Sequence, residues 1–353
     1  MLDKILSINI YLVLAMSSKI IQFSIIIPFK SGKKYLLECL HSVLAQDYPY
    51  YNVIILADNT SNADNALNEV LALQNNKISI LQSNEPLNIL QNWGRIKEID
   101  KFEYMTLLGY DDVLEKTFLS TIHQLIQQSP EASLYHTHFK YINSETEYIK
   151  NCQPLPYQLN VSEYLSLALQ QNIDIMATGY VFKSSDYDAL GGIPTQYPNL
   201  IYADLQLWIA LTKKSHLVVA PSVQFSFRIH ASTTKTSPNK ILLDAFLIFL
   251  NYLYQLKQES TTLASIIEKN GKRFTENTTK EIAHRLLRTP KKLREGFTID
   301  TMIKKIEKAS SLLHIDYAPS QIKSIRIAKL IEGNDLLNTL FLFFKKIYKK
   351  PIL

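Results

Sequence analysis

The sequence is poor in the residues that build disulfide frameworks, zinc sites and glycine-rich phosphate loops. Its 353 residues include two cysteines, Cys39 and Cys152. Two thiols are too few for a disulfide scaffold or a structural zinc site, so we expect two core thiols in a reducing compartment. The segment Lys30-Ser31-Gly32-Lys33 is too thin a match to a phosphate loop. These absences exclude a disulfide-rich scaffold and weigh against nucleotide chemistry of the phosphate-loop type.

Long hydrophobic runs are also missing. The apolar stretch Ile5–Met16 is shorter than the roughly 20 residues that cross a bilayer. Lys4 precedes it, which leaves a signal peptide as an alternative, but no clear small-residue cleavage site follows before Phe23. We therefore predict an N-terminal extension over residues 1–21 and a cytoplasmic protein.

Charge is low overall and unevenly distributed. Hydrophobic residues make up 46% of the chain and charged residues 20%, which is typical of a globular protein. Residues 1–235 hold 17 basic and 21 acidic side chains, against 21 and 11 in residues 236–353. A basic C-terminal third is compatible with a solvated helical face, an anionic membrane surface or nucleic acid, in falling order of expectation.

Short apolar runs alternate with amphipathic stretches over the first two thirds of the chain. Phe23–Pro28 is a β-branched run ended by proline, which predicts a strand buried on both faces, and Lys34–Ala45 has helical spacing. The alternation predicts further strands at Tyr51–Ala57, Ile78–Gln82, Glu103–Leu108, Ser133–Ile142, Tyr180–Lys183 and Leu217–Val223, and further helices at Ala63–Leu73, Leu87–Ile99, Phe118–Ser129, Val161–Gln170 and Asp204–Lys214.

This order predicts an α/β fold over residues 22–235, with a mostly parallel central sheet flanked by helices. From about Asn239 the pattern is helical throughout, which predicts an α-helical C-terminal region over residues 236–353. A length of 353 residues agrees with two such units, because single cores rarely grow past roughly 250–300 residues.

Polar segments follow several predicted strands. In an open parallel sheet, ligands bind beyond the carboxyl ends of the strands, so these segments are candidates for a site. They are Pro28-Phe29-Lys30-Ser31, Asp58-Asn59-Thr60-Ser61, Asp111-Asp112 and Arg228-Ile229-His230.

Seven segments in one order carry a resemblance to a known family. They are residues 24–30, 52–61, 92–95, 107–114, 188–193, 204–208 and 227–232. Together they resemble family-two glycosyltransferases of the GT-A fold, of the type that builds bacterial surface polysaccharides. The resemblance implies a Rossmann-like sheet and metal-dependent, inverting transfer of a sugar from a nucleotide diphosphate sugar, with a UDP-sugar favoured, onto a glycan or lipid-linked acceptor.

The family pattern is incomplete at three positions. Tyr110 stands where many relatives have a further aspartate, which weakens the metal site without removing it. Asn59 and Ala203 replace frequent acids beside Asp58 and Asp204. These two departures bear on donor preference more than on reaction class.

The resemblance assigns a metal site to the paired acids. A nucleotide diphosphate leaves readily only when its growing charge is neutralised, and a hard divalent cation held by carboxylate oxygen does that. Asp112 is the expected direct ligand of Mn²⁺ or Mg²⁺, with His230 completing the site. Asp111 is expected to bind through water or to contact the sugar hydroxyls.

The remaining nucleotide-sugar contacts are expected from Pro28, Phe29, Asn92, Arg95 and Arg228, with the two arginines facing the diphosphate. Asp58 follows the second strand and is expected to accept a hydrogen bond from a base imide. The alternative for Asp58 is an Asx turn with Thr60 and Ser61.

Asp204 is the expected general base. Inverting transfer requires an acceptor hydroxyl to be deprotonated on the face opposite the leaving group. A position in the first turn of a helix favours the carboxylate anion. The alternative is a helix cap without catalytic role.

The C-terminal region carries no chemical motif, but two basic helices are expected, at Glu281–Arg294 and Asp335–Lys350. The second combines leucine and phenylalanine with four lysines, a composition suited to peripheral contact with anionic lipid on the inner face of the cell membrane. A helix docked on the catalytic domain is the alternative. Nucleic-acid binding is not expected, because the basic and aromatic residues lie apart.

Two other functions compete with the transferase. A nucleotidyltransferase shares a Rossmann-like sheet and paired acids but is disfavoured by the missing phosphate loop. A non-catalytic nucleotide-sugar binding module is suggested by Tyr110, and donor hydrolysis would separate it from an enzyme.

Overall fold

A ten-stranded sheet forms the centre of the part of the chain that this computed structural model describes, residues 20–229 and 237–347. The strand order is β3-β2-β1-β4-β9-β6-β10-β5, with β7 beside β6 and β8 beside β10. The strands are β1 Phe23–Pro28, β2 Tyr51–Asp58, β3 Ile78–Ser83, β4 Tyr104–Leu107, β5 Val113–Leu114, β6 Leu134–Ile142, β7 Tyr148–Asn151, β8 Gln158–Leu159, β9 Val181–Lys183 and β10 Leu217–Arg228.

The long strands run in one direction. β1 pairs in parallel with β2 and β4, β2 with β3, and β6 with β10. Short β9 lies antiparallel between β4 and β6, so β6 and β10 regain the direction of β1. The carboxyl ends of β1, β2, β4, β6 and β10 therefore meet at one edge, as the sequence predicted for a mostly parallel sheet.

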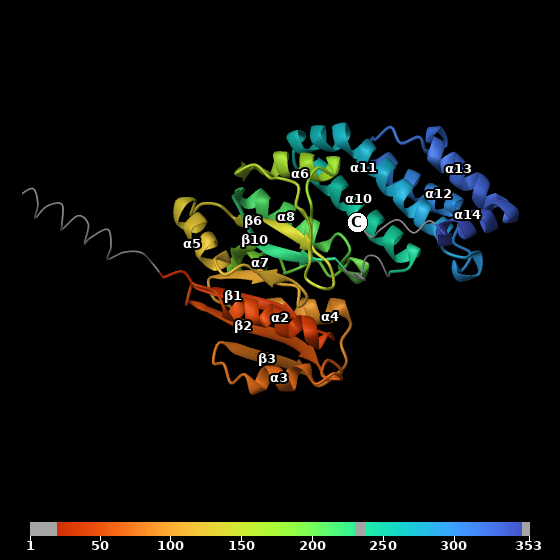
Figure 1. Cartoon of the computed structure of the whole chain (residues 1–353). Helices are drawn as coiled ribbons and strands as arrows, with labels where there is room; N and C mark the ends of the chain where they lie inside the picture. Colours follow the sequence, from red (N-terminus) through yellow and green to blue (C-terminus); the bar gives the residue numbers. More distant parts are fainter. Residues whose placement is uncertain (1–19, 230–236, 348–353) are drawn as a thin grey trace, which may run out of the picture.

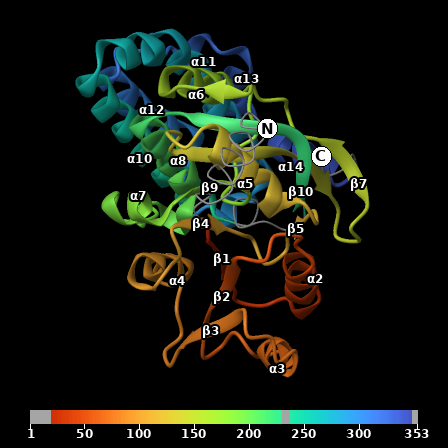
Figure 2. The same ribbon diagram turned by 90° about the vertical axis from the view of Figure 1, so that its left-hand side faces the viewer.

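Helices cover both faces of this sheet. Figure 2 shows α2 (Lys33–Leu44) and α4 (Ile89–Gly94) on opposite sides of β1 and β2. One core contains side chains of α2, α3 (Ala66–Ala72) and α5 (Phe118–Gln128), and the other contains those of α6 (Val161–Gln170), α7 (Ser184–Ala189) and α8 (Ala203–Lys214). The predicted layered α/β fold is confirmed.

β1 shows why its sequence is apolar at successive positions. Phe23, Ile25 and Ile27 are buried in the core on the α2 side, while Ile26 is buried in the core on the α6 and α8 side. All six residues of the strand are buried. A strand between two helical layers has no solvent face, so its sequence lacks polar alternation.

The C-terminal region is helical, as predicted, and packs on the α6 and α8 side of the sheet (Figure 1). Tyr202, just before α8, stacks on Phe249 with ring centroids 5.1 Å apart. Within the described ranges, no helix is long and apolar enough to cross a membrane. The helices are α10 Asn239–Glu259, α11 Thr261–Arg288, α12 Ile299–Leu312, α13 Lys323–Gly333 and α14 Asp335–Ile347.

Three predicted boundaries were wrong. The predicted helix Glu281–Arg294 is the end of the 28-residue helix α11, which stops before Pro290 because proline cannot continue a helix. The predicted helix Leu87–Ile99 divides into α4 and a 3₁₀ turn, Arg95–Glu98. β10 runs on to Arg228 through register shifts after Ala220, where Pro221 lacks an amide donor.

Candidate active site

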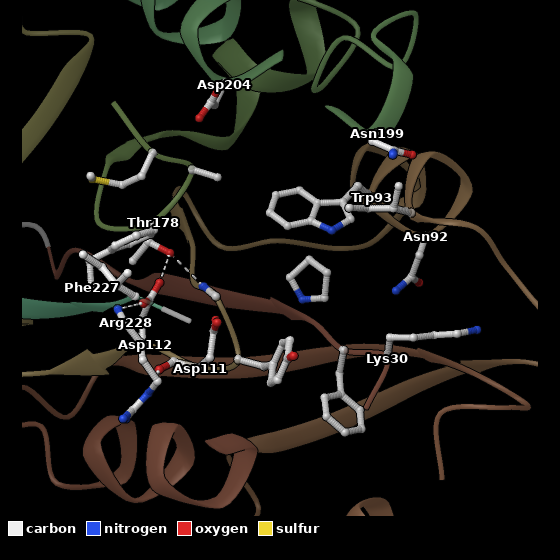
Figure 3. A pocket seen from close by; sticks show the side chains of 18 of the residues that line it. Lys30, Asn92, Trp93, Asp111, Asp112, Thr178, Asn199, Asp204, Phe227 and Arg228 are labelled. Atoms are coloured by element: carbon white, nitrogen blue, oxygen red, sulfur yellow. Dashed lines mark hydrogen bonds between the residues drawn. The ribbon is translucent and has the colours of Figure 1, made fainter. Parts of the chain in front are cut away.

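A cavity of about 850 Å³ opens at the carboxyl edge of the sheet. Its walls include residues 28–30 after β1, residues 109–112 after β4, residues 227–229 at the end of β10 and residues 175–178 before β9. Figure 3 shows Asp204 and Asn199 on the side opposite Asp111, Asp112 and Lys30. Strand order thus brings together three of the four polar segments that the sequence singled out.

Asp112 lies at the base of this cavity and is held by two protein donors. Its side chain is buried, with Thr178 Oγ1 donating to Oδ2 at 2.5 Å and the Arg228 backbone N–H donating to Oδ1 at 2.9 Å. Burial, and secondly the charge of Asp111, raise the pKa of Asp112 well above its ordinary value. The two hydrogen bonds fix the carboxylate at the meeting point of β4, β9 and β10.

Gly109 explains how two carboxylates fit beside each other. A Cβ atom at this position would lie 2.6 Å from Asp112 Oδ2, 2.9 Å from Asp111 Oδ1 and 3.2 Å from Thr178 Oγ1. Oxygen atoms of both aspartates therefore converge on the space that glycine leaves open. Any larger residue would displace at least one of them.

This donor set fits a hard divalent cation. Two adjacent carboxylates repel each other, and a cation would relieve that repulsion. Each Asp112 oxygen keeps lone-pair capacity beyond its one hydrogen bond. Within residues 20–229 and 237–347 there is no group of three or more His, Cys, Asp or Glu side chains that could hold a metal ion. The predicted ligand His230 lies outside the described residues.

Arg228 lines the cavity, but its guanidinium points into the protein. Nη2 donates to Glu38 Oε2 at 2.8 Å, Nε to the Asp111 carbonyl at 2.7 Å, and Nη1 to the Asn143 carbonyl at 3.0 Å and to Thr146 Oγ1 at 2.9 Å. The side chain is fully buried. The structure thus replaces the predicted phosphate contact by a structural one, in which Arg228 ties the carboxyl ends of β6 and β10 to α2.

Asp58 is buried beneath Lys30 and does not line the cavity. Its Oδ2 accepts from Lys30 Nζ at 2.5 Å and from the Leu87 N–H at 2.7 Å, while Oδ1 accepts from Thr60 and Ser61. Burial by itself would raise the pKa of Asp58, but these hydrogen bonds, with that from Lys30 the strongest, outweigh it and hold the pKa well below its ordinary value. The Asx turn that the sequence left as an alternative is present, and Lys30 faces the ligand space.

Asn92 and Arg95 differ in their relation to the cavity. Asn92 lines it and donates from Nδ2 to the Leu56 carbonyl at 3.0 Å. Arg95 does not line it, because Nη2 donates to the carbonyls of Ala57 and Leu81 at the ends of β2 and β3. A diphosphate contact by Arg95, as predicted, does not agree with this arrangement. Its side chain joins α4 to the sheet because carbonyls at strand ends lack sheet partners.

Pro28 and Phe29 both line the cavity, as expected for residues directly after β1. Phe29 is buried and meets Tyr110 edge to face, with ring centroids 5.4 Å apart. Tyr110, the departure from the family pattern, therefore contributes a wall rather than a third carboxylate.

Asp204 enters the cavity from the opposite wall, in the first turn of α8. The Leu205 N–H donates to its Oδ1 at 2.8 Å. The helix begins one residue earlier than predicted, and the capping position belongs to Tyr202, whose φ of 72° is left-handed. Burial raises the pKa of Asp204 to about 6, against the helix amides that favour the anion. The expected helix effect is present but smaller than the cost of desolvation.

Comparison with known proteins identifies the N-terminal unit. Residues 24–184 match the model of glycosyl transferase family 2. The similarity to that family is thus carried by this segment of the chain. A curated relative, the glycosyltransferase GlyG of Streptococcus pneumoniae serotype 4, is 21% identical over 164 residues, which cover 46% of this chain and 53% of GlyG. The match thus spans about half of that relative.

Solved structures share the fold over a longer part of the chain. One is the structure of residues 1–349 of S. aureus TarS in complex with UDP-GlcNAc. Its superposition covers 89% of this chain and 92% of the TarS chain, with 13% identity and a TM-score of 0.59. A mannosyltransferase from Pyrobaculum calidifontis, in complex with GDP-Man and Mn²⁺, covers 93% of this chain and 89% of its own, with 10% identity and a TM-score of 0.50. The predicted GT-A fold is confirmed.

A second cavity adjoins the first on the side of the C-terminal helices. It has a volume of about 420 Å³, and it shares Ile175, Asn199 and Asp204 with the larger one. Its other walls come from α6, α10 and α11. Asp204 therefore stands between two cavities, one on the sheet edge and one under the C-terminal helices.

Sequence reasoning missed two residues that hold the candidate site together. Thr178 orients Asp112 from a loop before β9, 66 residues further along the chain. Glu38 on α2 binds the Arg228 guanidinium. Threonine in a loop and glutamate on a helix face carry no local signal, so only the fold could have identified them.

Proposed function

We propose that the chain is a metal-dependent, inverting glycosyltransferase. It transfers a sugar from a nucleotide diphosphate sugar, with a UDP-sugar favoured, onto a hydroxyl of a glycan or lipid-linked acceptor during synthesis of a cell-surface polysaccharide. The observation that carries this proposal is the presence of carboxylates on two opposite walls of one cavity. Asp111 and Asp112 lie on one wall and Asp204 on the other.

The donor class is supported by the similarity of residues 24–184 to glycosyl transferase family 2 and by the ligands of similar structures. TarS was solved with UDP-GlcNAc and the Pyrobaculum enzyme with GDP-Man. In this chain the nucleotide would lie along Pro28, Phe29 and Lys30 at the end of β1, facing Asn92 and Trp93 on α4. A cavity of about 850 Å³ lies within the range of small-molecule and cofactor sites.

Asp111 and Asp112 would hold Mn²⁺ or Mg²⁺, with His230 kept as a further ligand from the sequence. When bound, such a cation supplies positive charge that stabilises the departing diphosphate. The protein's own contribution is to keep the Asp112 carboxylate in place through Thr178 and the Arg228 amide. The Pyrobaculum structure with Mn²⁺ supports this choice of cofactor.

Asp204 would act as the general base. The acceptor oxygen attacks the anomeric carbon as the bond from that carbon to the diphosphate oxygen breaks, and the hydroxyl proton passes to Asp204. Attack from the face opposite the leaving group inverts the anomeric centre. A pKa of about 6 suits this task, because the carboxylate is ionised near neutrality yet still accepts a proton readily.

A melting-temperature screen of nucleotide diphosphate sugars tests the proposal, followed by donor hydrolysis and transfer with Mn²⁺ and with a chelator. A donor at about 100 times its dissociation constant should stabilise the fold by roughly 2.7 kcal/mol. Asp112→Ala should remove the metal-dependent part of that shift, whereas Asp100→Ala, at an exposed carboxylate outside the cavity, should not. Metal-dependent binding without hydrolysis or transfer would favour the non-catalytic module instead.

A further inference from the structure

One face of the last helix, α14, is a continuous apolar surface open to solvent. Leu336 is 70% exposed, Leu340 47%, Phe343 59% and Ile347 60%. Their spacing of four, three and four residues places them within about 60° of one another around a helix with 100° per residue. We call these four side chains the α14 stripe.

The rest of α14 is anchored to the protein. Asn338 is buried on the side opposite the stripe, and Phe341 packs against the main core. The helix contacts α11 and α13, and Asp335 at its start forms an ion pair with Lys291 at 2.5 Å. The helix is therefore docked through one face, and its exposed stripe is a surface of the folded protein.

α13 and the last turn of α14 carry basic side chains and further exposed apolar ones. Lys346 is exposed and Lys345 partly exposed in the last turn of α14. On the neighbouring helix α13, Ile327 and Leu330 are exposed together with Arg326. Figure 1 shows α13 and α14 together at the periphery of the helical region, away from β3 and α3.

We propose that α13 and α14 form a docking surface for an anionic lipid bilayer, with the stripe inserted at the headgroup level. Isolated exposed leucines are ordinary, but a row of large apolar side chains bordered by basic ones matches the amphipathic helices that lie in a membrane interface. A symmetric dimer through the same face would bring the two sets of basic side chains together. An anionic surface complements both the apolar stripe and the charge around it.

This proposal goes beyond the proposed transferase, because membrane binding does not depend on the nucleotide site. It also provides a reason for a C-terminal region without a chemical motif. A catalytic unit held on a membrane would meet a lipid-linked acceptor by diffusion in two dimensions.

Sedimentation of the full chain with vesicles tests the surface. The vesicles contain phosphatidylcholine alone or equal parts of phosphatidylcholine and phosphatidylglycerol. We expect binding to the anionic vesicles only, and weaker binding in high salt. The triple variant Leu340→Ser, Phe343→Ser and Ile347→Ser should lower the partition coefficient at least about tenfold. The control, Leu71→Ser on α3, also alters a side chain that is 64% exposed and should bind like the parent.

A second pair of variants tests the charge. Lys345→Glu with Lys346→Glu should weaken binding about tenfold or more, since each basic residue near an anionic surface contributes about fivefold. Lys97→Glu with Lys116→Glu changes the net charge equally at exposed sites in the N-terminal unit and should have little effect. Melting temperature and donor binding check that each variant folds.

Three results would overturn the proposal. The parent fails to bind anionic vesicles, the stripe variant binds them as well as the parent, or light scattering shows that the parent is a dimer that the stripe variant dissociates. Failure in these assays leaves donor binding at the nucleotide site intact, so it is distinguishable from a failure of the proposed transferase.

Discussion

Asp204→Asn separates catalysis from stability more clearly than any other substitution. The parent carboxyl has a pKa of about 6 in the folded protein because burial opposes its ionisation, against an ordinary value of 3.8. Asparagine keeps the shape and can still accept the Leu205 N–H, which lies 2.8 Å from Oδ1 in the parent. It cannot take a proton from an acceptor. The variant should therefore lose turnover by about 10²–10⁴-fold while keeping donor and metal affinity.

The same substitution should increase the stability of the fold, but only at pH values where the parent carboxyl group is ionised. Above the folded pKa, the parent carries an ionised carboxylate that the unfolded chain solvates better. This penalty is absent below about pH 4, grows between about pH 4 and pH 6 and is complete above pH 6. It amounts to on the order of 1–3 kcal/mol. Asp204→Asn should thus raise the melting temperature by a few degrees near neutrality and leave it unchanged in acid.

The assay needs transfer rates between about pH 5 and about pH 7.5, melting curves at about pH 3.5 and about pH 7.5, and a matched control. Asp300→Asn provides that control, because Asp300 also lies in the first turn of a helix but is exposed and paired with Lys329. Parent kcat/KM should fall about tenfold per pH unit below about pH 6. Turnover close to the parent's in Asp204→Asn, or a melting-temperature difference that does not depend on pH, would refute the assignment.

Three further substitutions test the architecture of the site. Lys30→Met removes the ion pair of buried Asp58 and should cost about 1–3 kcal/mol of unfolding free energy in urea titrations. Lys34→Met, in an exposed pair, should leave the unfolding free energy nearly unchanged, and equal losses in the two variants would contradict the burial of Asp58. Gly109→Ala should displace the paired carboxylates and abolish metal-dependent donor binding with little loss of secondary structure, as calorimetry and circular dichroism can show. Arg228→Met leaves its buried partners unsatisfied and should cost about 3–5 kcal/mol in urea, and a stability like the parent's would return Arg228 to ligand binding.

Much of the fold could be predicted because its determinants are local. Phe23–Pro28 and Val161–Gln170 have the bounds that the sequence predicted, since proline ends the first and Asn160 caps the second with a complete capping box. Boundaries failed where a local signal was ambiguous. The predicted strand Leu217–Val223 is too short, because β10 runs on to Arg228 through shifts of register after Ala220.

The composition of the site was partly predictable for a topological reason. Parallel strands place their carboxyl ends at one edge, so the order of the predicted strands was enough to place Pro28, Asp111 and Arg228 together. The direction in which each side chain points could not be predicted from the order of the strands. Arg228 carries the charge expected of a phosphate ligand, yet its guanidinium donates to Glu38 and to the Asn143 carbonyl just after β6.

The sequence by itself determined the layered α/β fold, the helical C-terminal region and the edge of the sheet where the cavity lies. The tertiary structure alone decided which charges meet and which stay hydrated. Lys30 binds Asp58 across 28 residues of the chain, and Thr178 binds Asp112 across 66. Burial raises the pKa of Asp204, although the amides of its helix favour the anion. Pairing and desolvation depend on distances in space, and no local pattern of residues encodes them.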